Sequence, residues 1–144
     1  MPDTPRTAAD VLPATGLAAG ELRDVMPRVD PSQVRVRSAT PGFVRTWAKC
    51  IRAVTMPWAV YFHPEVMARY TRGEGLERVG LLMVHELMHV EQLARMGAVR
   101  HSAHYVRDYL RGRLGGSSHW DAYRNVQLEA EARAATRLVA ARRR

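Results

Sequence analysis

The chain has 144 residues and a net charge of +8, and 47% of its residues are hydrophobic. This length and composition are typical of one folded domain with a core of its own, and they exclude an intrinsically disordered chain. Arginine carries almost all of the positive charge, because Lys49 is the only lysine, but the arginines are spread along the whole sequence. We interpret them as a solvated basic surface, so nucleic acid is not the expected partner.

Cysteine usage and the N-terminal residues limit the kinds of site and the location. Cys50 is the only cysteine, which excludes an intrachain disulfide and a cysteine-based zinc cluster. The first ten residues lack the positive flank and the apolar core of a signal peptide, and no apolar run is as long as a membrane span. We therefore expect a cytoplasmic protein with no transmembrane segment.

The N-terminal third shows weak signals for regular structure. Residues 1–16 are rich in Pro, Ala, Thr and Asp without a clear period, which predicts a flexible lead-in before a single domain over residues 17–144. Residues 17–26 have the spacing of a short helix. Residues 34–37 alternate apolar and charged side chains as a half-exposed strand does, and residues 41–42, Pro-Gly, predict a turn.

The next two segments are expected to be a helix and a strand. The apolar residues of 43–54 fit one face of a helix better than a strict alternation. Residues 58–62 are aromatic and β-branched and lie between Pro57 and Pro64, which predicts a strand at a sheet edge, where proline is tolerated. His63 follows this strand, and we interpret it as an ordinary, partly exposed histidine.

Three helices are predicted for the rest of the chain. Residues 76–96 carry a long helical pattern that ends at Gly97, a residue type favoured at helix C-termini. A second helix is expected over 101–114. Asp121 is a suitable N-cap for a final helix over 122–142, whose apolar stripe has the spacing of a core-facing side.

The run His85-Glu86-Leu87-Met88-His89 lies inside the predicted helix 76–96. Residues four apart share one face of a helix, so the two histidines can present their imidazoles to a single zinc ion, and Glu86 can act as a general base. Shuffling this composition would give the motif by chance in about 1% of chains. The alternative is a surface helix with two ordinary histidines, but the apolar residues around the motif indicate a buried helix.

A catalytic zinc ion usually has three protein ligands, so a third must come from elsewhere in the chain. The extension His-x-x-Gly-x-x-His is excluded, because Gln92 and Arg95 stand where it requires glycine and histidine. On a helical wheel the two acidic candidates of the final helix both flank the apolar stripe, so spacing alone does not separate them. The candidates for the third ligand are His101, His104, His119, Glu129 and Glu131.

The run HELMHVEQ followed by Glu129-Ala130-Glu131-Ala132 resembles the zincin-type metallopeptidases that use a glutamate as third ligand, the gluzincins. Over about residues 58–135 the chain is similar to small bacterial metallopeptidase-like domains, whose pattern includes Gln92 and a Tyr-Arg pair, here residues 123–124. The resemblance implies a minimal zincin-like domain of α+β class, with a small β-sheet packed on the motif helix and on C-terminal helices.

The same resemblance implies a set of roles. Zinc would be held by His85, His89 and Glu129, with Glu86 as the general base and Glu131 as a solvated or salt-bridged charge. Related zincins often carry an aspartate four residues after the glutamate ligand, which orients the first histidine. Arg133 stands at that position here, so another group must support His85, and Asp108 and Asp121 are candidates.

The function implied is hydrolysis of peptide bonds in a peptide or protein substrate by a zinc-activated water molecule. Tyr123, His119 and Arg124 are candidate donors to the developing oxyanion, and by analogy strand 58–62 could pair with an extended substrate. Two alternatives remain: a zinc-binding docking module without useful activity, and a basic adaptor for nucleic acid or anionic membrane. An intact Glu86 favours catalysis, because a structural metal site needs no base there.

Overall fold

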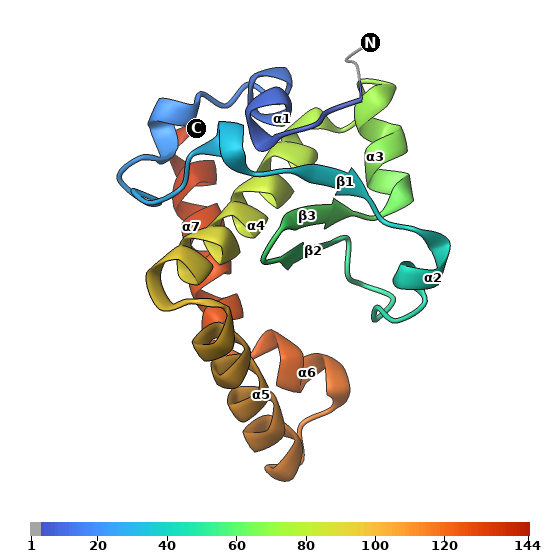
Figure 1. The fold of residues 1–144 in the computed structure, drawn as a ribbon, viewed down its shortest axis with the longest axis vertical. Helices are drawn as coiled ribbons and strands as arrows, with labels where there is room; N and C mark the ends of the chain where they lie inside the picture. The colour runs from blue at the N-terminus through green and yellow to red at the C-terminus, as the bar shows by residue number, and fades with distance from the viewer. Residues whose placement is uncertain (1–3) are drawn as a thin grey trace.

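Helix α4 (Leu76–Met96) runs through the middle of the molecule, and the other elements are arranged around it (Figure 1). The structure is a computed structural model that describes residues 4–144. Its class is mixed α+β, as predicted, and mostly helical. Besides α4, the described residues form α1 (Ala8–Ala14), α2 (Pro41–Val44), α3 (Pro64–Thr71), α5 (Ala98–Leu114), α6 (His119–Arg124) and α7 (Gln127–Arg142), and strands β1 (Val36–Ser38), β2 (Ala53–Met56) and β3 (Ala59–Phe62).

The three strands form one small mixed sheet in the order β1-β3-β2. Strand β3 pairs in parallel with β1, with Val36 opposite Val60, and antiparallel with β2, with Thr55 opposite Val60. The prediction of an edge strand at residues 58–62 is therefore wrong, because β3 is central and β2 is at an edge. Pro57 and Pro64 lie just outside the paired residues of β3, so neither removes a hydrogen bond from the sheet.

The predicted helix at residues 43–54 is also wrong. Helical structure here is limited to the single turn α2, which begins at Pro41 and is capped by Thr40, whose Oγ1 accepts a hydrogen bond from the Phe43 amide. The expected turn at Pro41-Gly42 is thus the start of this short helix. The last two residues of the segment belong to β2, where pairing with β3 outweighs the helical spacing of the apolar residues.

The N-terminal residues pack against α4. Ala8, Val11 and Leu12 lie on one face of α1 and are completely or almost completely buried. The interpretation of a flexible lead-in is therefore wrong for residues 8–14, since burial of this face stabilises the helix; the first three residues lie outside the described part of the chain. The helix expected at 17–26 reduces to a 3-10 turn at Ala19–Leu22.

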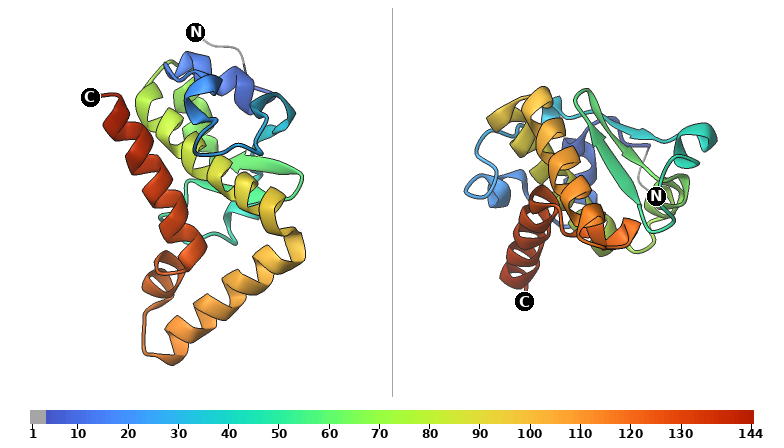
Figure 2. Two further views of the ribbon diagram at one scale, coloured as in Figure 1. Left: turned by 90° about the vertical axis from the view of Figure 1, so that its left-hand side faces the viewer. Right: turned by 90° about the horizontal axis from the view of Figure 1, so that it is seen from below.

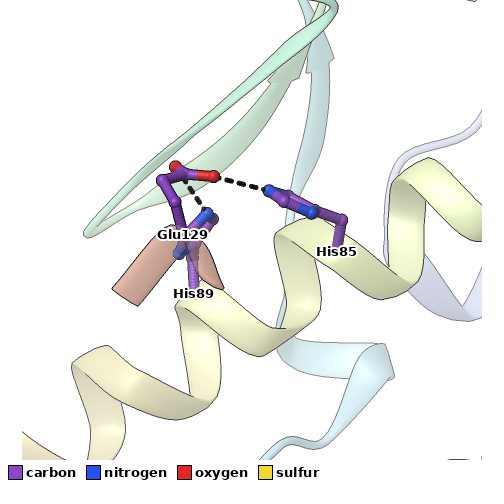
Figure 3. Close-up of side chains that lie close together, drawn as sticks. All are labelled: His85, His89 and Glu129. Atoms are coloured by element: carbon purple, nitrogen blue, oxygen red, sulfur yellow. Dashed lines mark hydrogen bonds and ion pairs between the residues drawn. The ribbon is translucent and has the colours of Figure 1, made fainter. Parts of the chain in front are cut away.

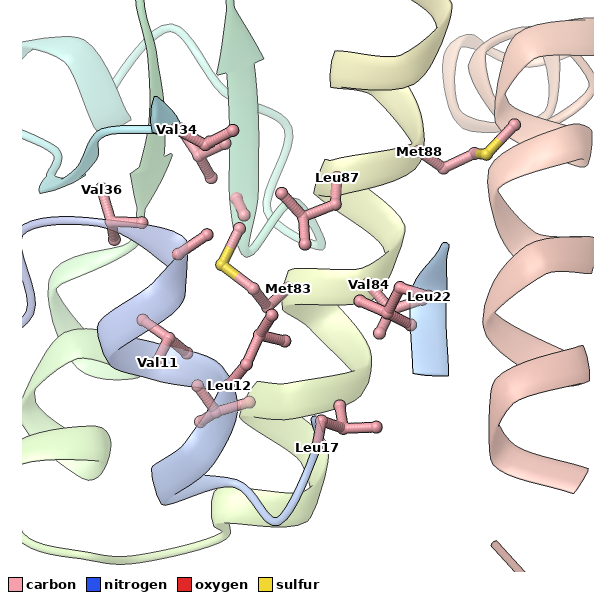
Figure 4. Packing of buried hydrophobic residues seen from close by; sticks show 14 of the residues in the cluster. Val11, Leu12, Leu17, Leu22, Val34, Val36, Met83, Val84, Leu87 and Met88 are labelled. Atoms are coloured by element: carbon pink, nitrogen blue, oxygen red, sulfur yellow. The ribbon is translucent and has the colours of Figure 1, made fainter. Parts of the chain in front are cut away.

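The hydrophobic core lies between α1, the sheet and α4 (Figure 4). Met83 and Leu87 of α4 face α1 and the strands, whereas Met88 points toward α7 (Figure 4). All three side chains are buried. Helix α4 is therefore apolar on more than one side, as its sequence predicted, and its boundaries match the prediction, with Gly97 at its C-terminus in a positive-φ conformation at 82°.

Helices α4 and α7 lie side by side in opposite directions (Figure 2). The predicted helix 101–114 is confirmed as α5, which begins three residues earlier. The predicted helix 122–142 is divided at Asn125-Val126 into α6 and α7, and the N-cap of α6 is Ser118 instead of Asp121. Within residues 4–144, no helix combines the length and apolar character needed to cross a membrane.

Candidate metal centre

His85, His89 and Glu129 converge on one point between α4 and α7 (Figure 3). His85 Nε2 lies 3.0 Å from Glu129 Oε2, and His89 Nε2 lies 3.1 Å from Glu129 Oε1. Each residue offers one ligand atom, and these atoms all lie within 4.8 Å of one another. The structure therefore brings together the three residues that the family resemblance implied, although they are far apart in the sequence.

The local structure explains how Glu129 reaches this point. Asp108 on α5 accepts a hydrogen bond from the backbone amide of Gln127, the first residue of α7, at 3.1 Å. Because α7 begins there, Glu129 lies in its first turn, where a carboxylate is stabilised by the positive end of the helix dipole. The histidines sit one turn apart on the buried helix α4, so both imidazoles point to the same side.

The electrostatics of this group favour a cation between its members. Burial alone would raise the pKa of Glu129, but hydrogen bonds from His85 and His89 outweigh it and lower the pKa to about 2. Burial alone would lower the pKa of His89, but the hydrogen bond and the charge of Glu129 raise it to about 9. At neutral pH, a proton on His89 Nε2 thus occupies a position that a metal ion could take instead.

Gln92 orients His89 from the other side of its ring. Gln92 Nε2 donates hydrogen bonds to the Leu128 carbonyl and to Glu131 Oε2, both at 2.9 Å. Its Oε1 must therefore accept, and it lies 2.9 Å from His89 Nδ1, which carries the proton. This arrangement leaves Nε2 of His89 as the nitrogen for a metal ion. Sequence reasoning placed Gln92 in the family pattern but did not predict this role.

Glu131 does not join the group. Its carboxylate forms a salt bridge with Arg95 at 3.0 Å and accepts the hydrogen bond from Gln92. It is thus the salt-bridged charge that the resemblance implied. Its contribution is indirect, because it helps to hold Gln92, which in turn holds His89.

The remaining histidine candidates have other contacts. His101 is buried and lies 3.3 Å from Gln92 Oε1, and its burial, together with the nearby charge of His89, lowers its pKa to about 4. His104 contacts Arg107, and His119 contacts the Tyr109 hydroxyl. None of the three belongs to the metal-ligand group found within residues 4–144. His63, outside the motif as expected, accepts a hydrogen bond from the Glu65 amide at the start of α3.

Neither Asp108 nor Asp121, the candidates for the support of His85, forms a hydrogen bond with it; both have other partners. Asp108 caps α7, and Asp121 takes part in the N-cap of α6 with Ser118. Arg133, at the position where the resemblance led us to expect an aspartate, donates a hydrogen bond to the carbonyl of Arg124 at 2.6 Å. Within residues 4–144, the side-chain hydrogen bond of His85 is the one between Nε2 and Glu129.

Two tyrosines hold the carboxylate of Glu129. Tyr123 donates a hydrogen bond to Oε1 at 2.9 Å, and Tyr105 donates to the same oxygen. Burial raises the pKa of Tyr123, and the negative charge of Glu86 raises it further, so its phenol stays protonated and able to donate. Tyr105 was not a candidate, because nothing in its local sequence indicates that α5 turns this side chain toward α7.

Glu86 is held beside the group without belonging to it. Its side chain is buried, and Thr55 of β2 donates a hydrogen bond to Oε2 at 2.6 Å. The Thr55 hydroxyl also lies 3.2 Å from the backbone carbonyl of Glu86. Sequence reasoning missed Thr55, because it did not predict β2 and so had no strand to place against the motif helix.

A cavity of about 460 Å³ opens beside the metal-ligand group. His85, Glu86, Tyr123 and Glu129 all line it. Its walls come from α4, α6, α7 and the segment that leads into β2. A small molecule or an extended chain in this cavity would therefore contact the group directly, and α6, which the sequence did not separate from α7, supplies one of the walls.

Comparisons with known proteins identify no relative of this chain. No family model, no curated protein and no solved structure matches the chain. The likeness to zincins therefore rests on the motif and on the geometry of His85, His89 and Glu129. Two imidazole nitrogens and one carboxylate oxygen are a ligand set that catalytic zinc sites use, which leaves a coordination position for water or substrate.

Proposed function

We propose that the protein is a zinc-dependent hydrolase of peptide bonds. The observation that carries the proposal is the convergence of His85, His89 and Glu129 beside a buried Glu86, at the wall of a cavity. A site that only stabilised the fold would need the three ligands and a fourth to close the coordination shell. It would not need a carboxylate held in place next to them.

The ligand residues fit zinc by their chemistry. His85 and His89 would supply Nε2 atoms, and Glu129 would supply a carboxylate oxygen. When bound, zinc would supply a Lewis acid that polarises the substrate carbonyl and lowers the pKa of a water molecule toward ~7. Gln92 keeps His89 in the tautomer that this requires, and the tyrosines restrain Glu129.

Glu86 acts as the general base in this proposal. The Thr55 hydroxyl holds Oε2, so the carboxylate has a fixed orientation and Oε1 is left for the proton of the attacking water. Glu86 then returns the proton to the nitrogen of the leaving amine as the peptide bond breaks. Burial of the carboxylate keeps competing water away from this exchange.

Tyr123 is the residue that we assign to the oxyanion. Its phenol lines the cavity, whereas Tyr105 is absent from the cavity wall. If Tyr123 turned from Glu129 to the developing oxyanion, Tyr105 would still hold Oε1 of that carboxylate. His119 contacts Tyr109 and does not line the cavity, so it is not a donor in this proposal.

An extended substrate would align along β2. Strand β3 is paired on both sides, so it cannot accept a further strand, contrary to the expectation for residues 58–62. Strand β2 is at the edge of the sheet, its first residue Ala53 lines the cavity, and its Thr55 contacts Glu86. Main-chain hydrogen bonds to this edge would hold a peptide across the group.

The experiment that tests the proposal compares Glu86→Gln with the wild type. Both proteins are loaded with zinc, their metal content is measured, and hydrolysis of a mixed peptide library is followed by mass spectrometry. We expect one zinc ion in each protein and a loss of at least about 100-fold in cleavage rate for the variant, because the base is removed while the ligands stay. Zinc binding without cleavage by the wild type would favour the docking module instead.

A further inference from the structure

The charges that line the cavity are unevenly distributed. Its two carboxylates, Glu86 and Glu129, are both engaged, by Thr55 and by the metal-ligand group. The other formally charged side chains on its wall are arginines: Arg52, Arg124 and Arg133. Away from Glu86 and the metal-ligand group, the formal charges on the cavity wall are therefore all positive.

Two of these arginines are available for a ligand. Arg52 is neutralised by a salt bridge with Glu65 at 2.9 Å. Arg124 and Arg133 form no salt bridge with any residue of the described part of the chain. Arg133 is half-buried, and its hydrogen bond to the Arg124 carbonyl ties its guanidinium to the end of α6. Because that bond uses one nitrogen, Nη2, other N–H groups of Arg133 remain free to donate.

The position of Arg133 places this charge close to the reaction. Arg133 follows Glu129 by four residues on α7, so it lies on the same face of the helix, about 6 Å further along its axis. Leu81 and Leu82 of α4, both half-buried, add apolar surface to the cavity lining. A charge pair formed by the half-buried Arg133 inside the cavity would be less screened by water than one on the open surface.

We propose that Arg124 and Arg133 bind a carboxylate of the substrate, one or two residues away from the bond that is cleaved. This inference rests on the proposed function and names the substrate class: peptides that carry an acidic side chain or a free C-terminal carboxylate at that position. Guanidinium groups suit carboxylates because their planar N–H donors can bind both oxygens at once. The replacement of the aspartate of related zincins by Arg133 thus has a function in substrate binding.

The test measures peptide binding in place of cleavage. The Glu86→Gln protein, loaded with zinc, is titrated calorimetrically with short alanine-rich peptides. The peptides are acetylated and amidated and differ only in one residue: Glu, Gln or Lys. A fourth peptide has the Gln sequence and a free C-terminus, which separates the two sources of the carboxylate. We expect the Glu peptide, the free-acid peptide or both to bind about ten-fold more tightly than the amidated Gln peptide.

Arginine variants then locate the effect. Arg133→Gln and Arg124→Gln, each in the Glu86→Gln background, should remove most of the preference for the carboxylate. Arg137→Gln is the matched control, because Arg137 is an exposed arginine on the same helix that does not line the cavity. A preference that persists after removal of zinc by a chelator would show that the arginines, and not the metal, bind the carboxylate.

Equal affinity for the Glu, Gln and free-acid peptides, or no binding of any peptide, would overturn the proposal. So would a preference for the carboxylate peptides that is unchanged in both Arg124→Gln and Arg133→Gln, or one that Arg137→Gln lowers to the same extent. The outcome is separable from the proposed function. Cleavage by the wild type without a preference for acidic peptides would contradict this inference alone. Selective binding of carboxylate peptides without any cleavage by the wild type would contradict the hydrolase and keep the carboxylate site.

Discussion

At the scale of single residues, the geometry of the candidate site depends on side chains outside the metal-ligand group. His89 can serve as a ligand only if its proton sits on Nδ1, and the orientation of Gln92 ensures this. Glu129 can serve only if its carboxylate is held still, and two tyrosines restrain it. Both kinds of support act through hydrogen bonds buried with the ligands, where their loss is costly.

Replacing Gln92 by leucine should weaken zinc binding. The change removes the acceptor for His89 Nδ1 and frees the ring to rotate or to change tautomer, so we expect zinc affinity to fall by about 10 to 100-fold. Competition with a chromophoric chelator measures this affinity. Glu131→Gln is the comparison variant: because Glu131 acts on His89 only through Gln92, this variant should lose less zinc affinity than Gln92→Leu. An unchanged affinity in a folded Gln92→Leu protein would mean that Gln92 does not orient His89.

The two tyrosines should have separable effects. Tyr105→Phe removes a restraint on the ligand Glu129, so zinc affinity should fall, and the cleavage rate at saturating zinc should change by less than about threefold. Tyr123→Phe removes a similar restraint, so its zinc affinity should also fall, but at saturating zinc its kcat should in addition be lower by about 10 to 100-fold, because the variant lacks the proposed oxyanion donor. Parallel zinc titrations and steady-state kinetics distinguish the pair, and a Tyr123→Phe enzyme with wild-type kcat would exclude the oxyanion role.

The positions of His85, Glu86 and His89 on one buried helix could be predicted at this scale, whereas the residues that hold their side chains could not. The spacing of His85 and His89 is local and places both on one helical face. The bond from Gln92 to the Leu128 carbonyl joins residues 36 positions apart, and the bond from Thr55 to Glu86 joins residues 31 apart. Such contacts depend on the packing of whole elements, which no local pattern contains.

At the scale of elements, the break between α6 and α7 decides where Glu129 lies. The chain leaves the helical path at Asn125-Val126 and starts again at Gln127, whose amide is bound by Asp108. This restart turns the first turn of α7 toward α4. A continuous helix over residues 122–142, as the sequence predicted, would lack this capped start beside the histidines.

Asp108 should therefore stabilise the fold in a pH-dependent way. Although burial raises its pKa, hydrogen bonds from the Gln127 amide and Arg107 outweigh this and lower the pKa from its usual value of 3.8. Because the pKa is lower in the folded protein than in the unfolded chain, the stabilisation is complete when the pH is above the unfolded-state pKa. It is lost as the pH falls through the folded-state pKa. Asp108→Ala should lower the free energy of unfolding by about 1 kcal/mol at pH 7.

Urea denaturation at a series of pH values checks this expectation. The difference between wild type and Asp108→Ala should shrink below about pH 4, as the wild-type carboxylate is protonated. Asp108→Asn is the control, because it keeps an acceptor for the Gln127 amide without a titrating charge. A difference that does not change with pH would show that the charge of Asp108 contributes nothing to the start of α7.

Elements with a strong local pattern were predicted well. Helix α4 has a long apolar period and a terminal glycine, so both of its ends were predicted. Strand β2 is only four residues long, and its structure depends on pairing with β3. Helix α1 is short and contains Pro13, so its burial against α4 was not visible in its composition.

At the scale of the whole molecule, the metal-ligand group links helices α4 and α7. Helix α4 carries two of the three candidate ligands and forms the centre of the core, whereas α7 carries the third, 44 residues after His85. The α+β class and the buried position of the motif follow from the sequence. The arrangement of the cavity could not be predicted, because it depends on how α5 leaves the end of α4 and on where α6 packs beside α5 (Figures 1 and 2).

The measurement that tests the central claim most directly is the zinc content of purified protein by mass spectrometry after zinc loading and removal of excess metal. We expect one zinc ion per chain in the wild type and in Glu131→Gln, and none in His89→Ala or Glu129→Gln, with all four proteins folded by circular dichroism. Zinc retained by Glu129→Gln, or absent from the wild type, would contradict a metal centre formed by His85, His89 and Glu129.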